Sequence, residues 1–327
     1  MKNLVKKLMP EEVRLVYSGH KAYSREINRY NRNVISSLVS EQKLLGAITL
    51  KYHVLEKGFT MPTMRKGFGY EVIKTLIDLC NLYLDKNYDT GNVHFKHAVM
   101  LLNKYQSLHN EMGFTIDSDI SGRIRSLNER STISGVVEQL EFTREQYFKH
   151  QLSPFKEFAL SRHSVRNFTE EDVDIDLIKK AVEIAKKSPS SCNRQPNRLY
   201  IISDSKQIEW VLAAQKGNRG FGDRINKLLL LTGEISVFNG YAERNEAYVN
   251  SGLFAMGLLY GLHYYGLGAV PLAYIAVSDE EDDRIRALCK IPDSEVATMF
   301  IGCGNLPEEF KVARSPRYDS DQIISVV

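Results

Sequence analysis

From about residue 153 onward, short apolar segments alternate with longer amphipathic ones. Four of the short segments are predicted strands, at residues 199–202, 228–232, 269–273 and 298–301. Helical periodicity marks the longer segments, at residues 176–187, 205–215, 249–265 and 278–288. Residues 228–232 are almost entirely apolar, which is typical of a central strand covered on both faces. This alternation predicts a sheet sandwiched by helices, in an α/β or α+β domain.

The first half of the chain shows a different pattern. It contains only two prolines, Pro10 and Pro62, and its apolar residues recur at helical spacing. Three predicted helical segments lie at residues 27–48, 70–84 and 94–112. We therefore expect an all-α N-terminal region at residues 1–150, followed by a second domain at residues 151–327.

Composition excludes several classes of protein. The chain has 327 residues and 43 basic against 40 acidic side chains, so its net charge of +3 gives no indication of a nucleic-acid partner. No apolar run approaches the ~18–20 residues that a membrane span needs, and the N-terminal sequence does not resemble a secretory signal. The four cysteines are far apart and form no CxxC motif. We expect a reduced, cytoplasmic protein without a membrane span.

The densest group of chemically active side chains is the segment Arg162-His-Ser-Val-Arg166. Its two arginines, histidine and serine offer cationic and hydroxyl donors, and charge-assisted hydrogen bonds contribute about 1.5–3 kcal/mol each. A phosphate or another oxyanion is therefore one predicted ligand. The alternative is a solvated basic turn that pairs with Glu170, Glu171 and Asp172.

Three further segments are candidates for ligand contacts. Residues 187–196 (Lys-Ser-Pro-Ser-Ser-Cys-Asn-Arg-Gln-Pro) supply neutral donors and acceptors that suit the edge of a heteroaromatic ring, although these residues alone favour an ordinary capped turn. Residues 217–222 form a glycine loop, but it follows a helix and lacks the dinucleotide-binding spacing. Residues 266–271 lead from a helix into a strand, and their glycines allow backbone to approach a flat ligand.

Other catalytic constellations are not found in the sequence. It contains no GxSxG, Walker A or HExxH motif. His94 and His97 are three residues apart on a predicted helix, but no third ligand joins them at a suitable spacing, so no metal site is expected. Cys192 has no histidine at a recognisable spacing, which argues against cysteine catalysis.

Taken together and in this order, the motifs resemble those of the nitroreductase superfamily of flavin-dependent oxidoreductases. Residues 162–168 resemble its opening R-x-S-x-R/K-x-F motif, and residues 188–196 resemble its P-S-x-x-N-x-Q-P motif. Residues 250–252 and 265–271 resemble the long central helix and the strand after it, and residues 314–317 resemble the basic C-terminal phosphate clamp. The resemblance covers about residues 155–327, which makes residues 1–150 an atypical helical extension.

The resemblance implies an α+β fold, a three-layer α/β/α sandwich with a mixed sheet. It also implies an FMN-dependent oxidoreductase (EC 1) that moves a hydride from NADH or NADPH through flavin N5 to an unidentified organic acceptor. That acceptor is expected to be nitroaromatic or quinone-like in vitro, and no side chain needs to act as a catalyst because the flavin carries the chemistry. A homodimer with shared active sites is implied, and similar extensions suggest a pathway related to surface polysaccharides. The alternative is a flavin-binding interaction or regulatory protein with little turnover, whose helical half docks a partner.

The same resemblance assigns a role to each matching residue. The expected FMN phosphate ligands are Arg162 and Ser164, together with Arg314 or Arg317, and His163 is expected beside the phosphate and the ribitol. Arg166 is expected at the N1/C2=O edge, where a guanidinium favours the anionic reduced flavin. The residues expected to approach the flavin of the other subunit are Pro189, Ser190, Ser191, Asn193 and Gln195. The residues expected to back the isoalloxazine are Pro271, Leu272 and Ala273.

Two positions depart from the family pattern. Ala273 stands where many members have an acidic residue, and Gly222 falls near an expected flavin-binding Asn, for which Gln215 or Asn218 are candidate substitutes. Candidate substrate contacts lie in residues 238–246, at Tyr241, Glu243 and Arg244, although a solvated connection explains this segment equally well. In the extension, residues 52–58 and 61–69 either line the flavin pocket or form a packing corner.

Overall fold

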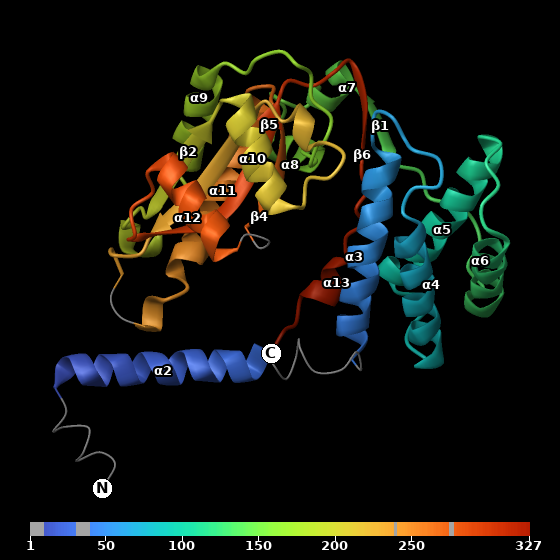
Figure 1. The fold of residues 1–327 in the computed structure, drawn as a ribbon, viewed down its shortest axis with the longest axis horizontal. Helices are drawn as coiled ribbons and strands as arrows, with labels where there is room; N and C mark the ends of the chain where they lie inside the picture. Colours follow the sequence, from blue (N-terminus) through green and yellow to red (C-terminus); the bar gives the residue numbers. More distant parts are fainter. Residues whose placement is uncertain (1–9, 31–39, 239–240, 275–277) are drawn as a thin grey trace, which may run out of the picture. The chain divides into compact units, whose positions relative to one another are not determined.

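The computed structural model describes residues 10–30, 40–238, 241–274 and 278–327 (Figure 1). Residues 31–39, which fall within the predicted helical segment 27–48, lie outside the described residues. The chain divides into two compact units. Unit 1 comprises residues 1–36 and 144–307, and unit 2 comprises residues 37–143 and 308–327. Residues 1–36 thus group with the second half of the chain and residues 308–327 with the first half, unlike the expected single division at residue 150.

Unit 1 is built on a four-stranded sheet with the strand order β2-β3-β5-β4. The strands are β2 (Asn197–Ile202), β3 (Lys227–Glu234), β4 (Gly268–Ala273) and β5 (Glu295–Gly304), so all four predicted strands are confirmed. All three strand pairs are antiparallel, whereas we expected a mixed sheet. Strands β3 and β4 do run in the same direction, but β5 lies between them and pairs with both.

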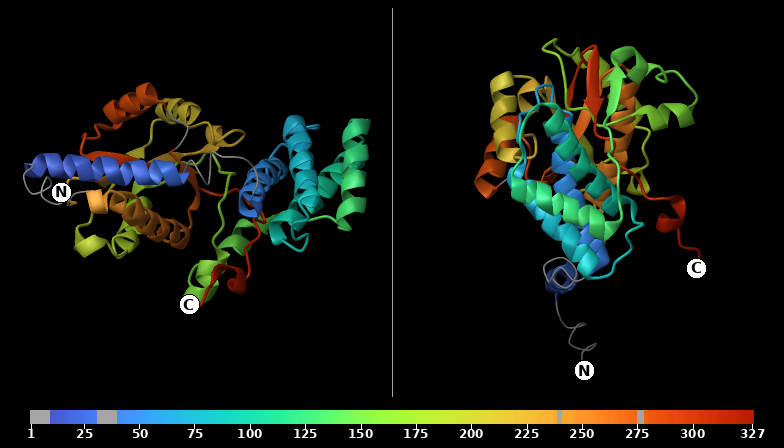
Figure 2. Two further views of the ribbon diagram at one scale, coloured as in Figure 1. Left: turned by 90° about the horizontal axis from the view of Figure 1, so that it is seen from below. Right: turned by 90° about the vertical axis from the view of Figure 1, so that its right-hand side faces the viewer.

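Helices cover both faces of this sheet. The four that do so are α9 (Ile175–Ala185), α10 (Ser205–Gln215), α11 (Glu246–Tyr264) and α12 (Asp279–Cys289). Leu229 and Leu231 of β3 pack into one cluster with α9 and α11. Leu228 and Leu230 are also fully buried, and they face the opposite side because side chains alternate along a strand. Figure 2 shows α10 and α12 on that opposite side, so unit 1 is a three-layer α/β/α sandwich.

Shorter elements of unit 1 surround the sandwich. They are α2 (Glu11–Tyr30), α7 (Arg144–Phe148), α8 (Phe155–Ser161) and the short 3-10 helices η2 (Ser191–Asn193), η3 (Gly222–Arg224) and η4 (Tyr241–Glu243). The ring centroids of Tyr23 on α2 and Tyr241 on η4 are 6.1 Å apart. This ring contact connects the N-terminal helix to the segment that precedes α11.

Unit 2 is mostly helical. Its helices are α3 (Glu41–Phe59), α4 (Tyr70–Asp85), α5 (Val93–Glu111), α6 (Ser118–Ser131) and the short α13 (Ser320–Ile323). The predicted helices at residues 70–84 and 94–112 are therefore confirmed. Unit 2 also contains a two-stranded antiparallel sheet of β1 (Leu140–Thr143) and β6 (Glu309–Val312), so residues 1–150 are not entirely helical.

Two observations bear on the expectations from composition. All four cysteines are free, and Cys80 and Cys303 are fully buried. In the described parts of the chain, no helix is both long enough and apolar enough to span a bilayer.

Candidate functional site

The segment that contains Arg162 to Phe168 lies against the open edge of β4. The backbone N–H of Val165 donates to the carbonyl oxygen of Ala269 over 3.1 Å. Val165 and Phe168 are buried, and a Cβ added to Gly304 would lie 2.9 Å from the Phe168 ring. The absence of a side chain at Gly304 therefore makes room for Phe168, which holds this end of the segment against the sheet.

Two polar side chains of this segment, those of Arg162 and Ser164, remain available for a ligand. Arg162 and Ser164 are half-buried, and neither side chain has a hydrogen bond or ion pair with another described residue. The guanidinium of Arg166 lies 5.9 Å from the centroid of the Phe221 ring. Of the acidic residues that we considered as partners of a basic turn, Asp172 forms an ion pair with Lys227 instead. A guanidinium without an internal acceptor beside a hydroxyl is the donor set that binds an oxyanion.

The end of β4 carries exposed side chains and backbone groups that point away from β5. Pro271 and Ala273 are exposed, whereas Leu272 between them is buried. The carbonyl oxygens of Ala269 and Ala273 both accept hydrogen bonds from outside the sheet, from Val165 N–H and from the Gln215 amide. Since a strand residue points its N–H and C=O to the same side, the N–H of Ala273 also points to this open edge.

Gln215 and Asn218 are both used within the loop that follows α10. The Gln215 side chain is buried, donates to the carbonyl of Ala273 over 3.1 Å and accepts the N–H of Gly217 over 2.8 Å. The amide of Asn218 donates to Gln215 over 3.2 Å. A side chain at Gly222 would collide with Asn218, which explains in steric terms why this chain has glycine there.

The loop at residues 188–196 docks on the beginning of α11. The N–H of Ser191 donates to Asn250 Oδ1 over 2.8 Å, and the Ser191 hydroxyl donates to the carboxylate of Glu246. Within the loop, the N–H of Gln195 donates to Ser190 Oγ over 3.1 Å. The residues with left-handed backbone conformation are Cys192, Asn193 and Gln195, with φ values of 53°, 55° and 47°. These bonds fix a loop whose backbone is otherwise strained.

The two motifs lie at opposite edges of one sheet. Residues 188–196 lead directly into β2 at one edge, and residues 162–168 lie against β4 at the other. Strands are spaced about 4.8 Å apart, so the three spacings from β2 to β4 separate these edges by about 14 Å. One copy of the chain therefore does not bring the two predicted parts of the flavin site together.

The candidate substrate residues are engaged in local contacts. Glu243 forms a two-bond ion pair with Arg194, with N–O distances of 2.6 and 2.9 Å. Arg194 also lies 4.8 Å from the centroid of the Phe238 ring, and Arg244 donates to the carbonyl of Tyr241 over 2.8 Å. The sequence offered no signal for the Arg194 pair because its members are 49 residues apart.

Arg314 and Arg317 belong to unit 2, not to the unit that contains Arg162. The Arg314 guanidinium donates to the carbonyl of Glu138 over 2.9 Å, and Arg317 donates to the carbonyl of Ser315. Their assignment to the FMN phosphate stays a prediction.

Residues 52–58 contribute a buried carboxylate to unit 2. Glu56 is fully buried, and its carboxylate lies 2.8 Å from His97 Nε2, 3.2 Å from His53 Nδ1 and 3.0 Å from the N–H of Ser315, which donates to it. Burial raises the pKa of Glu56, but the hydrogen bonds from His53, His97 and Ser315 outweigh it and lower the pKa to about 2. The network thereby holds the C-terminal segment on the helices of unit 2, a role that sequence reasoning missed.

We expect Glu56→Gln to remove part of the acid sensitivity of folding. Because the pKa of Glu56 lies below its ordinary value of 4.5, its carboxylate stabilises the fold fully above that pH and loses this contribution as pH falls toward 2. The difference corresponds to about 3 kcal/mol. Urea unfolding at pH 6 and pH 3 should show a smaller loss of stability in Glu56→Gln than in the wild type. Glu71→Gln, at a side chain that is 82% exposed, should leave the loss unchanged.

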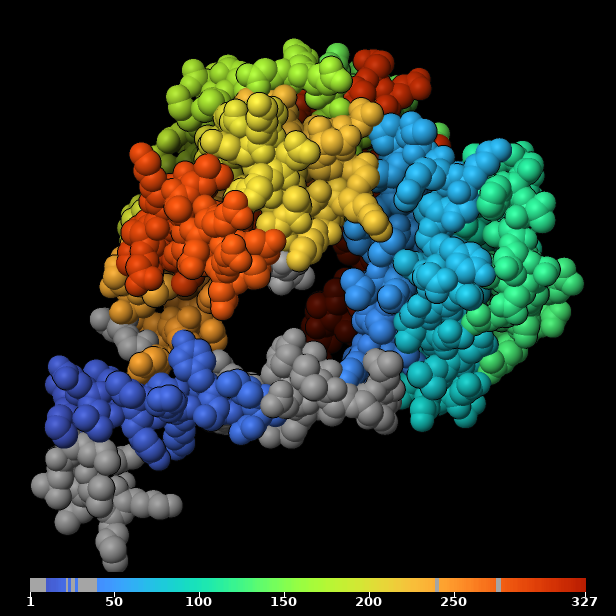
Figure 3. Space-filling view, viewed as in Figure 1, coloured from blue at the N-terminus to red at the C-terminus, as the bar shows by residue number. Residues whose placement is uncertain are grey.

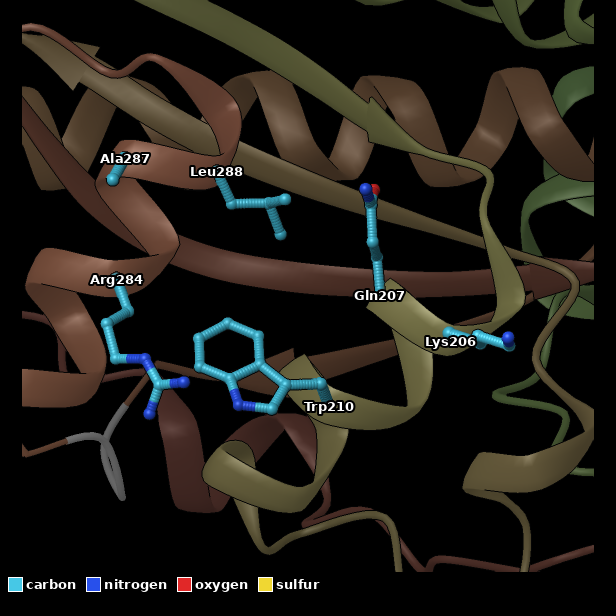
Figure 4. Close-up of a pocket in the computed structure, with 6 residues that line it drawn as sticks. All are labelled: Lys206, Gln207, Trp210, Arg284, Ala287 and Leu288. Atoms are coloured by element: carbon cyan, nitrogen blue, oxygen red, sulfur yellow. The ribbon is translucent and has the colours of Figure 1, made fainter.

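A surface cavity of about 420 Å³ lies between α10 and α12, which Figure 3 shows side by side. Its lining residues, drawn in Figure 4, are Lys206, Gln207, Trp210, Arg284, Ala287 and Leu288. The Arg284 guanidinium lies 5.0 Å from the centroid of the Trp210 ring. None of the residues that the sequence assigned to the flavin site lines this cavity.

Comparison with known proteins connects the sandwich to one family. Residues 159–305 match the model of the Nitroreductase family. A nitroreductase family protein from Streptococcus pneumoniae is 21% identical, with 53% of this chain and 100% of that chain aligned and a TM-score of 0.46. A nitroreductase-like protein from Streptococcus mutans is 19% identical, with 53% and 97% aligned and a TM-score of 0.45. No curated protein matches this chain. The part of the chain that is similar to this family, residues 159–305, lies within unit 1.

Proposed function

We propose that the nitroreductase-family domain at residues 159–305 binds FMN and transfers a hydride from NADH or NADPH to an organic acceptor. The observation that carries this proposal is the donor set on the open edge of β4. The half-buried guanidinium of Arg162 and the hydroxyl of Ser164 have no hydrogen-bond partner among the described residues, and the backbone of the adjacent Val165 is held on β4. Such a preorganised set suits the phosphate of FMN.

The residues of this edge fit the rest of the cofactor as well. FMN, when bound, supplies the hydride-accepting and hydride-donating chemistry. Pro271 offers an exposed apolar support for its ring system, and the outward N–H of Ala273 offers a hydrogen-bond donor to its edge. Arg166 brings a positive charge that stabilises negative charge on a reduced ring. Gln215 acts indirectly, because its amide holds the carbonyl of Ala273.

The proposed active unit is a homodimer. The loop at residues 188–196 and the segment at residues 162–168 lie at opposite edges of the sheet, so a second copy is needed to bring one of each together. Exposed apolar side chains on α11 and α8 support such an interface, since large exposed apolar areas mark association surfaces. They are Tyr248, Val249, Leu253, Phe155 and Leu160, of which each is at least 45% exposed.

The test of this function is a visible absorption spectrum of the purified protein, followed by anaerobic addition of NADH and then NADPH. We expect flavin bands near roughly 370 and 450 nm that bleach with one of the two nucleotides. Bound flavin that neither nucleotide reduces would favour a flavin-holding interaction protein. A colourless protein that does not take up added FMN would contradict the proposed cofactor.

A further inference from the structure

Tyr147 holds the middle of the segment that carries Arg162 and Ser164. Its side chain is 2% exposed, and its hydroxyl donates to the carbonyl of His163 over 2.9 Å. The same hydroxyl accepts the N–H of His163 over 3.1 Å. One side-chain group thus satisfies both backbone groups of His163. Tyr147 lies on α7, which precedes the residues that match the Nitroreductase family.

His263 holds the residue at the start of the same segment. It lies on α11 and is 1% exposed, and its Nε2 is 2.8 Å from Ser161 Oγ. The Ser161 hydroxyl also lies 2.8 Å from the carbonyl oxygen of Phe158, which accepts its only hydrogen. Ser161 must therefore accept a hydrogen from His263 Nε2. His263 is therefore the neutral tautomer that carries its hydrogen on Nε2, and its Nδ1 is unprotonated. Within the described part of the chain, Nδ1 has no hydrogen-bond partner.

Three aromatic rings enclose this imidazole. Those of Tyr147, Phe148 and Phe158 have centroids 5.1, 5.5 and 5.3 Å from that of His263. Burial, together with the charges of Arg162 and His163, lowers the pKa of His263 to about 4. His263 is therefore neutral at pH 7 and donates to Ser161 without adding a second cation beside Arg162.

We propose that Tyr147 and His263 are positioning residues that fix His163 and Ser161, and thereby aim Arg162 and Ser164 at the FMN phosphate. The inference rests on the proposed FMN site. Both side chains are almost fully buried and act through the backbone of His163 and the hydroxyl of Ser161. Their effect should therefore fall on the phosphate and not on the flavin ring. The chain would use them to prefer FMN over riboflavin, which lacks the phosphate.

The test compares the affinities of the full-length protein for FMN and riboflavin, measured by flavin fluorescence titration. We expect Tyr147→Phe to weaken FMN binding about 10-fold, because the lost hydroxyl leaves two backbone groups without a partner. Riboflavin binding should change less than about twofold. Tyr260→Phe is the matched control, since its ring packs on Phe155 and Phe158 of α8, and it should change neither affinity.

A second pair of variants tests the His263 contact. Ser161→Ala and His263→Leu should each weaken FMN binding several-fold, and the double variant should be no weaker than either single one. If Tyr147→Phe does not fold, Ser161→Ala carries the same comparison, because its side chain is small and half-buried. Equal losses for FMN and riboflavin would indicate general damage to the fold and overturn the inference, as would no loss. A wild type that binds neither flavin would instead overturn the proposed function.

Discussion

Replacing Arg162 with alanine is expected to weaken FMN binding about 100-fold and to leave riboflavin binding nearly unchanged. Charge-assisted hydrogen bonds contribute about 1.5–3 kcal/mol each, and a guanidinium donates two to a phosphate when it binds in a bidentate manner. The Arg162 guanidinium is half-buried and has no acceptor among the described residues, so its removal breaks no internal hydrogen bond or ion pair. Flavin fluorescence titration of both ligands measures the effect.

Two further variants make this result specific. Arg162→Lys keeps the charge but loses the planar, bidentate geometry, and its affinity should fall between those of the wild type and Arg162→Ala. Arg284→Ala removes an exposed arginine elsewhere in unit 1, at the cavity between α10 and α12, and should leave FMN binding unchanged. An Arg162→Ala protein that binds FMN as tightly as the wild type would remove this residue from the phosphate site.

The local pattern of the sequence predicted the elements of unit 1 well. Leu228–Leu231 are apolar in succession because both faces of β3 are covered, and the structure buries all four of them. Turn residues marked the ends of the strands, and periodicity marked the helices. The same local signals do not contain strand order, which is why the insertion of β5 between β3 and β4 and the resulting antiparallel pairing were not predicted.

Several of the contacts that sequence reasoning missed join residues far apart in the chain. β6 pairs with β1 across more than 160 residues, and Ser315 donates to Glu56 across 259 residues. The basic segment at residues 314–317 therefore contacts other residues of unit 2, and the sequence of the segment alone does not predict these contacts. The hydroxyl of Tyr147 is a similar case, because α7 carries no part of a recognised motif. Which side chain meets which backbone group depends on tertiary packing, and periodicity carries no information about it.

Leu253→Glu is expected to convert the proposed dimer to monomers and to abolish tight FMN binding. Leu253 is 45% exposed on α11, between the exposed Val249 and the rest of the apolar helix face. In a twofold dimer the substitution would bury two carboxylates in an apolar interface, which costs several kcal/mol. Light scattering after size exclusion should give twice 37.3 kDa for the wild type and 37.3 kDa for the variant.

Loss of FMN should accompany the loss of the dimer, because each proposed site needs the edge of β4 from one copy and the loop at residues 188–196 from the other. Leu50→Glu provides a control of the same chemistry, since Leu50 is 67% exposed on α3 of unit 2, and it should change neither mass nor affinity. A Leu253→Glu protein that remains a dimer would exclude this face of α11 as the interface. A monomeric variant that still binds FMN tightly would show that one copy completes the site. That result would contradict the proposal that the site needs both copies because its two motifs lie at opposite edges of the sheet.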